Sequence, residues 1–398
     1  MARTRKSLPR VDVAHLISTG VLASVCPRAL IDEVLAHTGK ASQRERLLPA
    51  PAVVYYVMAL ALWREAPLEE VLRVVCEGLQ WLGGGQASAV QASKSAISQA
   101  RTRLGPQVME QLAQRVLRPI ARPGAPGAWY RGFRLMALDG SCMDVADEAG
   151  NAAYFGYPSG SRGDGAFPQA QVLGLVECGT HVVTAAAIAP YGTSEQAMAT
   201  LVLPRSLAPD MLVLADRNFY GFKLWKLACA SRAKLLWRVK ANLTLQPDQQ
   251  LPDGSYLSTV YDSQDRQRKS GRKVRVIDYT LVDSAKPAQD SHRLVTNILD
   301  PQAAPALELA AVYHERWEVE SVFDEFKTHM RSASTVLRSK TPELVEQELW
   351  GLLMAHFAIR QLMEHAAWRQ QLDPDRLSFV HALRVVKRKM PQAAALPP

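Results

Sequence analysis

The segment Tyr313-His-Glu-Arg-Trp-Glu-Val-Glu-Ser-Val-Phe-Asp-Glu-Phe-Lys327 decides the fold of this chain. Its spacing predicts one amphipathic helix, because apolar residues recur through it on a single arc. At about 100° per residue, Tyr313, Arg316, Glu320 and Lys327 fall within roughly 60° of one another on the neighbouring arc. The apolar arc consists of Val312, Val319, Val322, Phe323, Phe326 and Met330.

The four polar residues provide a hydroxyl, two cations and one carboxylate on one face of the helix. Such a set suits a phosphate group held next to a metal ion. An alternative is that Glu320 is a surface carboxylate paired with Arg316 or Lys327 through helical spacing.

Two apolar runs further upstream each end directly in an aspartate. The run Phe133–Leu138 precedes Asp139, and the run Met211–Ala215 precedes Asp216. Aspartates at the ends of two strands can converge with Glu320 at one point above a sheet. Each aspartate alone also fits a turn or a helix cap. Other carboxylates compete nearby: Asp144, Asp147 and Asp210.

Three converging carboxylates repel one another unless cations neutralise them. Hard divalent ions with oxygen ligands do this, and Mg²⁺ is the usual ion beside phosphate. Two ions about 3.5–4 Å apart can activate water and stabilise the leaving oxygen of an in-line phosphoryl displacement. Asp139, Asp216 and Glu320 are therefore the predicted metal ligands and catalytic residues.

The composition describes a basic globular protein that lacks a membrane signature. The 398 residues carry a net charge of +9, which favours a polyanionic partner, nucleic acid before membrane. A merely basic enzyme is the alternative. The five cysteines are scattered and indicate reduced thiols rather than a disulfide frame. No secretory signal or membrane span is visible, so we expect a cytoplasmic protein.

Residues 1 to about 118 have the patterning of an all-helical region. Within it, Ser93 is a plausible N-cap of a short basic helix that ends at Gly105. This helix has the build of a recognition helix that enters a DNA groove, and a solvated surface helix is the alternative. Its candidate DNA-binding residues are Lys94, Arg101 and Arg103. A Pro- and Gly-rich linker follows at residues 119–127.

Beyond the linker, strands and helices alternate and predict a mixed α/β core. Residues 240–298 interrupt this core with a turn-rich, strand-like segment, and residues 341–390 are helical again. A basic hairpin around Ser270-Gly271 is either a solvated loop or a surface that tracks phosphates. Its candidate DNA-binding residues are Arg266, Arg268, Lys269, Arg272 and Lys273, with Arg275 beside them.

The pattern Y-x-x-R-x-x-x-E-x-x-x-x-x-x-K, formed by Tyr313, Arg316, Glu320 and Lys327, resembles the motif of the insertion-sequence-four family of bacterial DDE transposases. The spacing matches at all four positions, and the resemblance extends from about residue 20 to residue 365.

Both aspartates stand in segments that are similar to those of the same family. Asp139 lies in Leu-Asp-Gly-Ser, similar to L-D-G-[ST], and Asp216 lies in Leu-Ala-Asp-Arg-Asn-Phe, similar to L-A-D-R-G-F. Asn218 replaces the usual glycine, so the turn after Asp216 departs from the family pattern.

The resemblance implies an RNase H-like catalytic core with a β-rich insertion, preceded by an all-helical domain and followed by C-terminal helices. We expect boundaries at 1–128, 129–335 with the insertion at about 240–298, and 336–398. The resemblance also implies two Mg²⁺ ions, with Mn²⁺ as a substitute, held by the three carboxylates. It assigns DNA phosphates to four further residues: Tyr313, Arg316, Lys327 and Arg217.

These expectations describe a transposase that binds terminal inverted repeats and cuts and joins DNA through hairpin ends. Its partners would be double-stranded element ends, target DNA and a second copy of the chain. One alternative is a metal-dependent endonuclease of the same fold that never joins strands. Another is a DNA-binding protein descended from a transposase that no longer cuts; the intact carboxylates argue against it.

Overall fold

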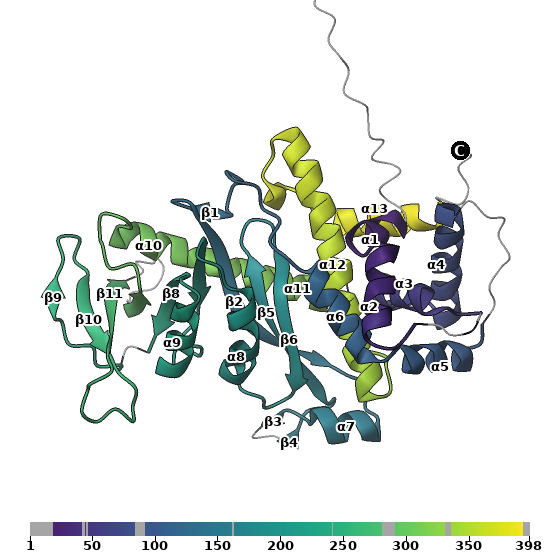
Figure 1. Ribbon diagram of the computed structural model, residues 1–398, viewed down its shortest axis with the longest axis horizontal. Coiled ribbons are helices and arrows are strands. Elements are labelled where there is room, and N and C mark those ends of the chain that lie inside the picture. The colour runs from purple at the N-terminus through teal and green to yellow at the C-terminus, as the bar shows by residue number, and fades with distance from the viewer. Residues whose placement is uncertain are drawn as a thin grey trace, which may run out of the picture.

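A ten-stranded mixed sheet forms the centre of the molecule, and a body of helices stands at one end of it (Figure 1). The computed structural model describes residues 19–41, 44, 47–83, 92–160, 163–240, 242–280, 291–330 and 336–392. The strand order is β6-β5-β2-β7-β8-β12-β11-β10-β9, with β1 paired to β2.

The first half of the sheet has RNase H-like topology. Antiparallel pairing joins β2 to β5 and β5 to β6, whereas β2, β7 and β8 run parallel. The predicted fold class is therefore confirmed. The strands are β1 (Trp129–Tyr130), β2 (Phe133–Asp144), β5 (Gln169–Glu177), β6 (Val182–Pro190), β7 (Met211–Ala215) and β8 (Lys234–Val239), beside a small pair of β3 (Ser159–Gly160) and β4 (Gly163–Asp164).

The insertion predicted between Asp216 and Glu320 is β-rich, and it continues the same sheet. The last of its strands in the sequence, β12 (Ser291–Thr296), pairs antiparallel with β8. The insertion therefore extends the sheet away from the helical body (Figure 1). Its strands are β9 (Gln249–Gln250), β10 (Tyr256–Val260), β11 (Arg272–Thr280) and β12 (Ser291–Thr296).

The basic hairpin predicted around Ser270-Gly271 is not a tight turn. Val260 pairs with Arg272, so a long loop joins β10 to β11. Arg275 is 0% exposed and donates to Ser255 Oγ at 2.8 Å, so it does not belong to a basic surface.

The two faces of the sheet pack against different helices. Met136 and Leu138 share a core with α8 (Glu195–Ser206) and α9 (Phe222–Ala230). Leu135 and Ala137 share the other core with α10 (Ala306–Tyr313) and α11 (Glu318–Asp324). Since side chains alternate along a strand, the next residue after Leu138 belongs to the α11 face.

The end of β2 differs from the sequence-based expectation. We expected the strand to stop at Leu138, but it continues to Asp144 because β5 keeps pairing with it as far as Gln169. The parallel pairing with β7 does stop at Leu138, opposite Ala215. Asp139 therefore lies directly after the last residue of β2 that pairs with β7, and it is still paired with β5.

The helical body combines both ends of the chain. The predicted C-terminal helical region is dominated by the long helix α12, which packs against α1, α3 and α6 and appears in yellow among the purple and blue helices of Figure 1. The boundaries expected at residues 128 and 335 stay predictions. No helix in the described part of the chain is long and apolar enough to cross a bilayer. The remaining helices are α1 (Thr19–Val25), α2 (Arg28–His37), α3 (Ala50–Leu60), α4 (Leu68–Gly83), α5 (Lys94–Leu104), α6 (Pro106–Val116), α7 (Ala149–Phe155), α12 (Pro342–Gln370) and α13 (Phe379–Gln392).

The basic helix α5 forms as predicted, but one of its three candidate DNA-binding cations is buried. Ser93 caps the helix by accepting a hydrogen bond from the Ala96 N–H at 3.3 Å. Lys94 and Arg103 are exposed. Arg101 is only 5% exposed and donates to Ser339 Oγ at 3.0 Å and to the Leu344 carbonyl at 2.8 Å. Arg101 therefore joins α5 to α12, and the interpretation of Arg101 as a groove-reading residue was wrong.

We expect Arg101→Ala to lower the free energy of unfolding by about 3 kcal/mol, because it leaves buried partners on α12 without their cation. The matched control is Arg103→Ala, two residues away and exposed, which should change stability by less than about 0.5 kcal/mol. Urea denaturation followed by circular dichroism measures both. Equal stabilities of the two variants would contradict the structural role of Arg101.

Candidate active site

The parallel pairing of β2 and β7 brings Asp139 and Asp216 next to each other. Leu138 and Ala215 are the last paired residues of these strands, and each aspartate comes directly afterwards. Asp139 Oδ1 accepts a hydrogen bond from the Gly140 N–H at 2.8 Å. Asp216 Oδ1 accepts one from the Asn218 N–H at 2.7 Å, which closes the turn. The turn thus forms with asparagine where the family usually has glycine.

Arg316 connects the aspartates to the third acid. Its Nη1 donates to Asp139 Oδ2 at 3.0 Å, and its Nη2 lies 3.6 Å from Glu320 Oε1. The guanidinium is largely buried and also lies 4.9 Å from the ring centre of Trp317. One buried cation therefore holds a strand carboxylate and a helix carboxylate together.

The pKa of Asp139 depends on its burial and on the charges around it. Burial raises the pKa of Asp139 above its ordinary value, and the neighbouring charges of Asp216 and Glu320 raise it further. The Gly140 N–H and the Arg316 guanidinium act in the opposite direction. The structure thus brings all three predicted carboxylates within electrostatic reach of one another, with one arginine that acts against their repulsion.

The segment that carries the motif is less regular than the predicted helix. A 3₁₀ turn (His314–Trp317) separates α10 from α11, and a π-helical turn (Glu325–His329) follows α11. Both turns change the number of residues per turn, so the segment is not the single regular helix that its spacing predicts, although Arg316 and Glu320 still pair across one turn. Tyr313 and Arg316 are buried, whereas Glu320 and Lys327 are exposed. The apolar stripe is confirmed by its buried members Val319, Val322, Phe323, Phe326 and Met330.

The expected phosphate-binding residues have unequal access to a ligand. Lys327 and Arg217 are exposed, so their side chains are available to DNA. The Tyr313 hydroxyl donates to the Ala215 carbonyl at 3.3 Å, and burial raises the pKa of this hydroxyl. Tyr313 therefore holds the end of β7 directly before Asp216, an arrangement that does not suit a direct phosphate contact.

Glu195 is a fourth carboxylate at this site, and sequence reasoning missed it. It begins α8, and burial together with the charges of Asp139 and Asp216 raises its pKa to about 7. In the sequence it has the signature of an ordinary acid in the first turn of a helix after a Ser cap. Only the folded structure shows that this turn lies near Asp139 and Asp216.

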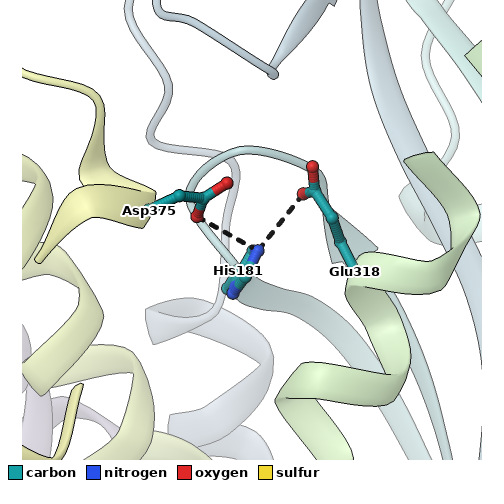
Figure 2. A group of neighbouring side chains, drawn as sticks. All are labelled: His181, Glu318 and Asp375. Carbon is teal, nitrogen blue, oxygen red and sulfur yellow. Dashed lines mark ion pairs between the residues drawn. The ribbon is translucent and has the colours of Figure 1, made fainter. Parts of the chain in front are cut away.

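A second polar group lies behind the helix that carries Glu320. Figure 2 shows His181 from the turn between β5 and β6, Glu318 from α11 and Asp375 from the 3₁₀ turn Pro374–Arg376. His181 Nε2 is 3.3 Å from both carboxylates. Among the described residues, this is the group whose potential ligand atoms all lie within 4.8 Å of one another.

The tautomer of His181 argues against a metal ion in this group. Arg360 Nη2 lies 2.8 Å from His181 Nδ1, and a guanidinium can only donate. Nδ1 therefore accepts, and Nε2 carries the proton toward the two carboxylates. A metal-binding histidine has the opposite arrangement, with a free lone pair toward the ion. The group thus fastens α11 to the β5–β6 turn and to the C-terminal region.

A further contact secures the other end of α11. Glu325 is buried and accepts hydrogen bonds from Arg360 and, at 2.7 Å, from His356 on α12. Although burial opposes its ionisation, His356 and Arg360 hold the pKa of Glu325 below its ordinary value. Glu320 therefore projects from a helix that is tied down on both sides.

We expect Arg316→Ala to destabilise the protein in EDTA by about 1–3 kcal/mol, because Asp139 and Glu320 lose their shared cation. Millimolar Mn²⁺ should recover much of this loss, since a divalent cation can replace the missing charge. Thermal melting with and without Mn²⁺ measures both effects. Arg217→Ala, an exposed arginine at the same site, is the control. Equal melting temperatures for Arg316→Ala and wild type in EDTA would contradict the charge-holding role.

Comparisons with known proteins agree with this geometry. A family described as insertion element 4 transposase N-terminal matches residues 16–114, and a family described as transposase DDE domain matches residues 130–358. The chain is 28% identical to the transposase InsG of insertion sequence element IS4 from Escherichia coli K12, over 91% of this chain and 80% of that protein.

Two other proteins are more distantly similar. A putative transposase InsZ of Escherichia coli K12 is 26% identical over 51% of this chain and 65% of that protein. A cryo-EM structure of a piggyBac transposase synaptic complex with hairpin DNA aligns with 95% of this chain and 81% of that chain, at 11% identity and a TM-score of 0.47.

The transposase DDE domain spans more than half of the chain and contains Asp139, Asp216 and Glu320. The chain therefore belongs to the insertion element 4 family of DDE transposases.

Proposed function

We propose that this chain cuts DNA at the ends of an insertion element and joins those ends to a target through phosphoryl transfers at Asp139, Asp216 and Glu320. The observation that carries the proposal is the contact of Arg316 with Asp139 at 3.0 Å and with Glu320 at 3.6 Å. This contact gathers acids from a strand and a distant helix beside Asp216. Such convergence has a cost in repulsion that a divalent cation at the site would remove.

The residues at the site fit a hard divalent cation. The donor set consists of carboxylate oxygens, which suit Mg²⁺ and also Mn²⁺. We propose that Asp139, Asp216 and Glu320 hold Mg²⁺ ions, with two ions expected. When bound, the ions would supply Lewis acidity toward the attacking and leaving oxygens of a phosphodiester.

The neighbouring side chains position these ligands and the DNA. Arg316 keeps Asp139 and Glu320 in register, and Tyr313 fixes the end of β7 through Ala215. The exposed cations Lys327 and Arg217 would bind phosphate oxygens beside the cleaved bond, because charge-assisted hydrogen bonds to phosphate are strong. Lys327 lies close enough to Cys142 on β2 for its charge to oppose the rise that burial causes in the thiol pKa.

DNA recognition would use two further surfaces. Exposed Lys94 and Arg103 on α5 would contact the terminal inverted repeats. The loop between β10 and β11 presents exposed cations that would follow the phosphate backbone, while Lys273 also pairs with Asp248 at 2.6 Å. These loop and strand cations are Arg266, Arg268, Lys269 and Arg272.

Both element ends must be cut together, so we propose a homodimer that holds paired ends. The mass of the complex with a single-end duplex, measured by light scattering, tests this directly. A complex of one protein and one duplex, throughout cleavage and joining, would rule the dimer out.

We also propose that hydrolysis of one strand frees a 3′-hydroxyl, which attacks a phosphodiester of the opposite strand and expels the 3′-oxygen of the flanking DNA. The element end is then a hairpin, which water must reopen to restore the 3′-hydroxyl before target joining. A denaturing gel of the cleaved end distinguishes the hairpin from an open end. Strand transfer with pre-cut ends separates the transposase from an endonuclease that never joins strands. End binding with no cleavage in Mg²⁺ would instead indicate a DNA-binding protein that no longer cuts.

We expect Glu320→Gln to abolish Mg²⁺-dependent nicking of a duplex taken from the DNA that flanks the gene. Binding to that duplex should stay within about tenfold of wild type, because the change removes a metal ligand and leaves the helical region intact. Asp324→Asn is the control, since Asp324 is an exposed acid one turn further along the same helix. Normal nicking by Glu320→Gln would refute the assignment of this residue.

We expect the double variant Arg266→Ala, Lys269→Ala to bind duplex DNA with a weaker dependence on salt. Each lost phosphate contact should reduce the slope of log K against log salt by about 0.9. Fluorescence anisotropy across a salt series measures the slope. Arg369→Ala, an exposed cation at the end of α12, is the control. An unchanged slope in the double variant would remove the loop from the DNA-binding surface.

A further inference from the structure

Glu195 reaches the active site from the layer of helices opposite α11. It begins α8, and the Ser194 side chain caps this helix by accepting a hydrogen bond from the Ala197 N–H at 3.2 Å. The helix packs on its own face of the sheet through Met198 and Val202. Its first turn therefore comes to the edge of the sheet at which Asp139 and Asp216 lie.

A side-chain contact ties the start of α8 to the turn that carries Asp216. Gln196 Nε2 donates to the Asn218 carbonyl at 2.7 Å. Asn218 belongs to the same turn, because its N–H donates to Asp216 Oδ1 at 2.7 Å. The position of Glu195 relative to Asp216 is thus fixed by a hydrogen bond through its immediate neighbour.

Gly140 leaves room for the Glu195 carboxylate. A Cβ atom at Gly140 would lie 2.4 Å from Glu195 Oε1 and 3.1 Å from its Cδ, far inside van der Waals contact. Gly140 directly follows Asp139 on β2, and its missing side chain would point to the α8 face. Any other residue at this position would displace the carboxylate from the strand that carries Asp139.

The charge of Glu195 has no partner in the protein itself. Within the described parts of the chain, Glu195 takes part in no hydrogen bond or ion pair. Arg316 is engaged with Asp139 and Glu320 on the α11 face. An acid in the first turn of a helix gains from the helix dipole, but that gain is equally available to a side chain turned toward solvent. The helix dipole therefore does not explain why the Glu195 carboxylate lies near those of Asp139 and Asp216.

We propose that Glu195 is a fourth carboxylate of the active site, which completes the oxygen ligands of a divalent cation held by Asp139 and Asp216, directly or through a water molecule. The proposal rests on the function proposed above. Mg²⁺ requires six oxygen ligands and usually keeps several waters, so a further carboxylate packed against Gly140 has a chemical use. Gly140 is then a positioning residue, since it lets Glu195 reach the cation.

The test measures Mn²⁺ binding to the full chain without DNA, using the loss of the free Mn²⁺ signal in electron paramagnetic resonance. Glu195→Gln keeps the shape of the side chain and removes its charge. We expect it to weaken Mn²⁺ binding by about tenfold or more, as changes to ligands and their supporting residues do. The matched control is Glu343→Gln, an exposed acid in the first turn of α12, which should bind Mn²⁺ like wild type.

Gly140→Ala provides an independent perturbation, because it displaces the Glu195 carboxylate without altering Glu195. It should weaken Mn²⁺ binding in the same way, and adding it to Glu195→Gln should weaken binding no further, since both changes remove one interaction. Additive losses would mean that Gly140 and Glu195 act separately and would overturn the pairing. Circular dichroism confirms that each variant is folded.

The variant Asp139→Asn separates this proposal from the function on which it rests. If Asp139→Asn loses Mn²⁺ while Glu195→Gln binds it like Glu343→Gln, the proposed active site stands and the role of Glu195 is wrong. If neither Asp139→Asn nor Glu195→Gln differs from wild type, the carboxylates do not bind the cation and both proposals fail. Nicking of the flanking-DNA duplex in Mg²⁺ should fall in Glu195→Gln in parallel with Mn²⁺ affinity.

Discussion

The repulsion between carboxylates that the sheet forces together is the constraint on which this structure depends. Parallel pairing of β2 with β7 ends at Leu138 and Ala215, so Asp139 and Asp216 must lie side by side. Arg316 offsets part of that repulsion by contacting Asp139 and Glu320 at once. A protein that keeps such an arrangement without enough internal positive charge is built to receive a cation from outside.

Polar contacts hold the α11 segment, which carries Glu320, on both of its sides. A ligand must be held close to its productive position, and helices hold side chains better than loops do. Here the segment passes through 3₁₀, α and π turns, and polar contacts fix it on both sides of Glu320. His181 binds Glu318 from the sheet, and Arg360 with His356 binds Glu325 from α12. The helical body therefore supports α11 directly.

Local patterns in the sequence were sufficient to predict the mixed α/β core and two aspartates at strand ends that could converge. The RNase H-like topology and the β-rich insertion were implied by the resemblance to a known family. Prediction from the sequence failed where tertiary contacts decide. Arg101 has the composition of a surface cation, yet its partners come from α12, far along the chain. The continuation of β2 depends on pairing with β5, and the 3₁₀ and π turns depend on packing against the sheet.

The missed carboxylate illustrates the same limit. In the sequence, Glu195 has the pattern of an acid in the first turn of a helix. The residues around it give no indication that it lies near Asp139 and Asp216 in the folded protein. The signal that could have found it is Gly140, in the tetrapeptide that contains Asp139. A glycine whose backbone is extended within a strand implies that something approaches the chain there.

The position of α12 has a consequence for the synthesis of the protein. Its buried residues complete the core that α3 and α6 begin, although the ribosome makes α3 long before Pro342. The residues of α3 and α6 that contact α12 therefore stay uncovered until α12 has been made. A polypeptide that ends before Pro342 would lack the contacts that α12 makes with α3 and α6 and with Glu325 after α11.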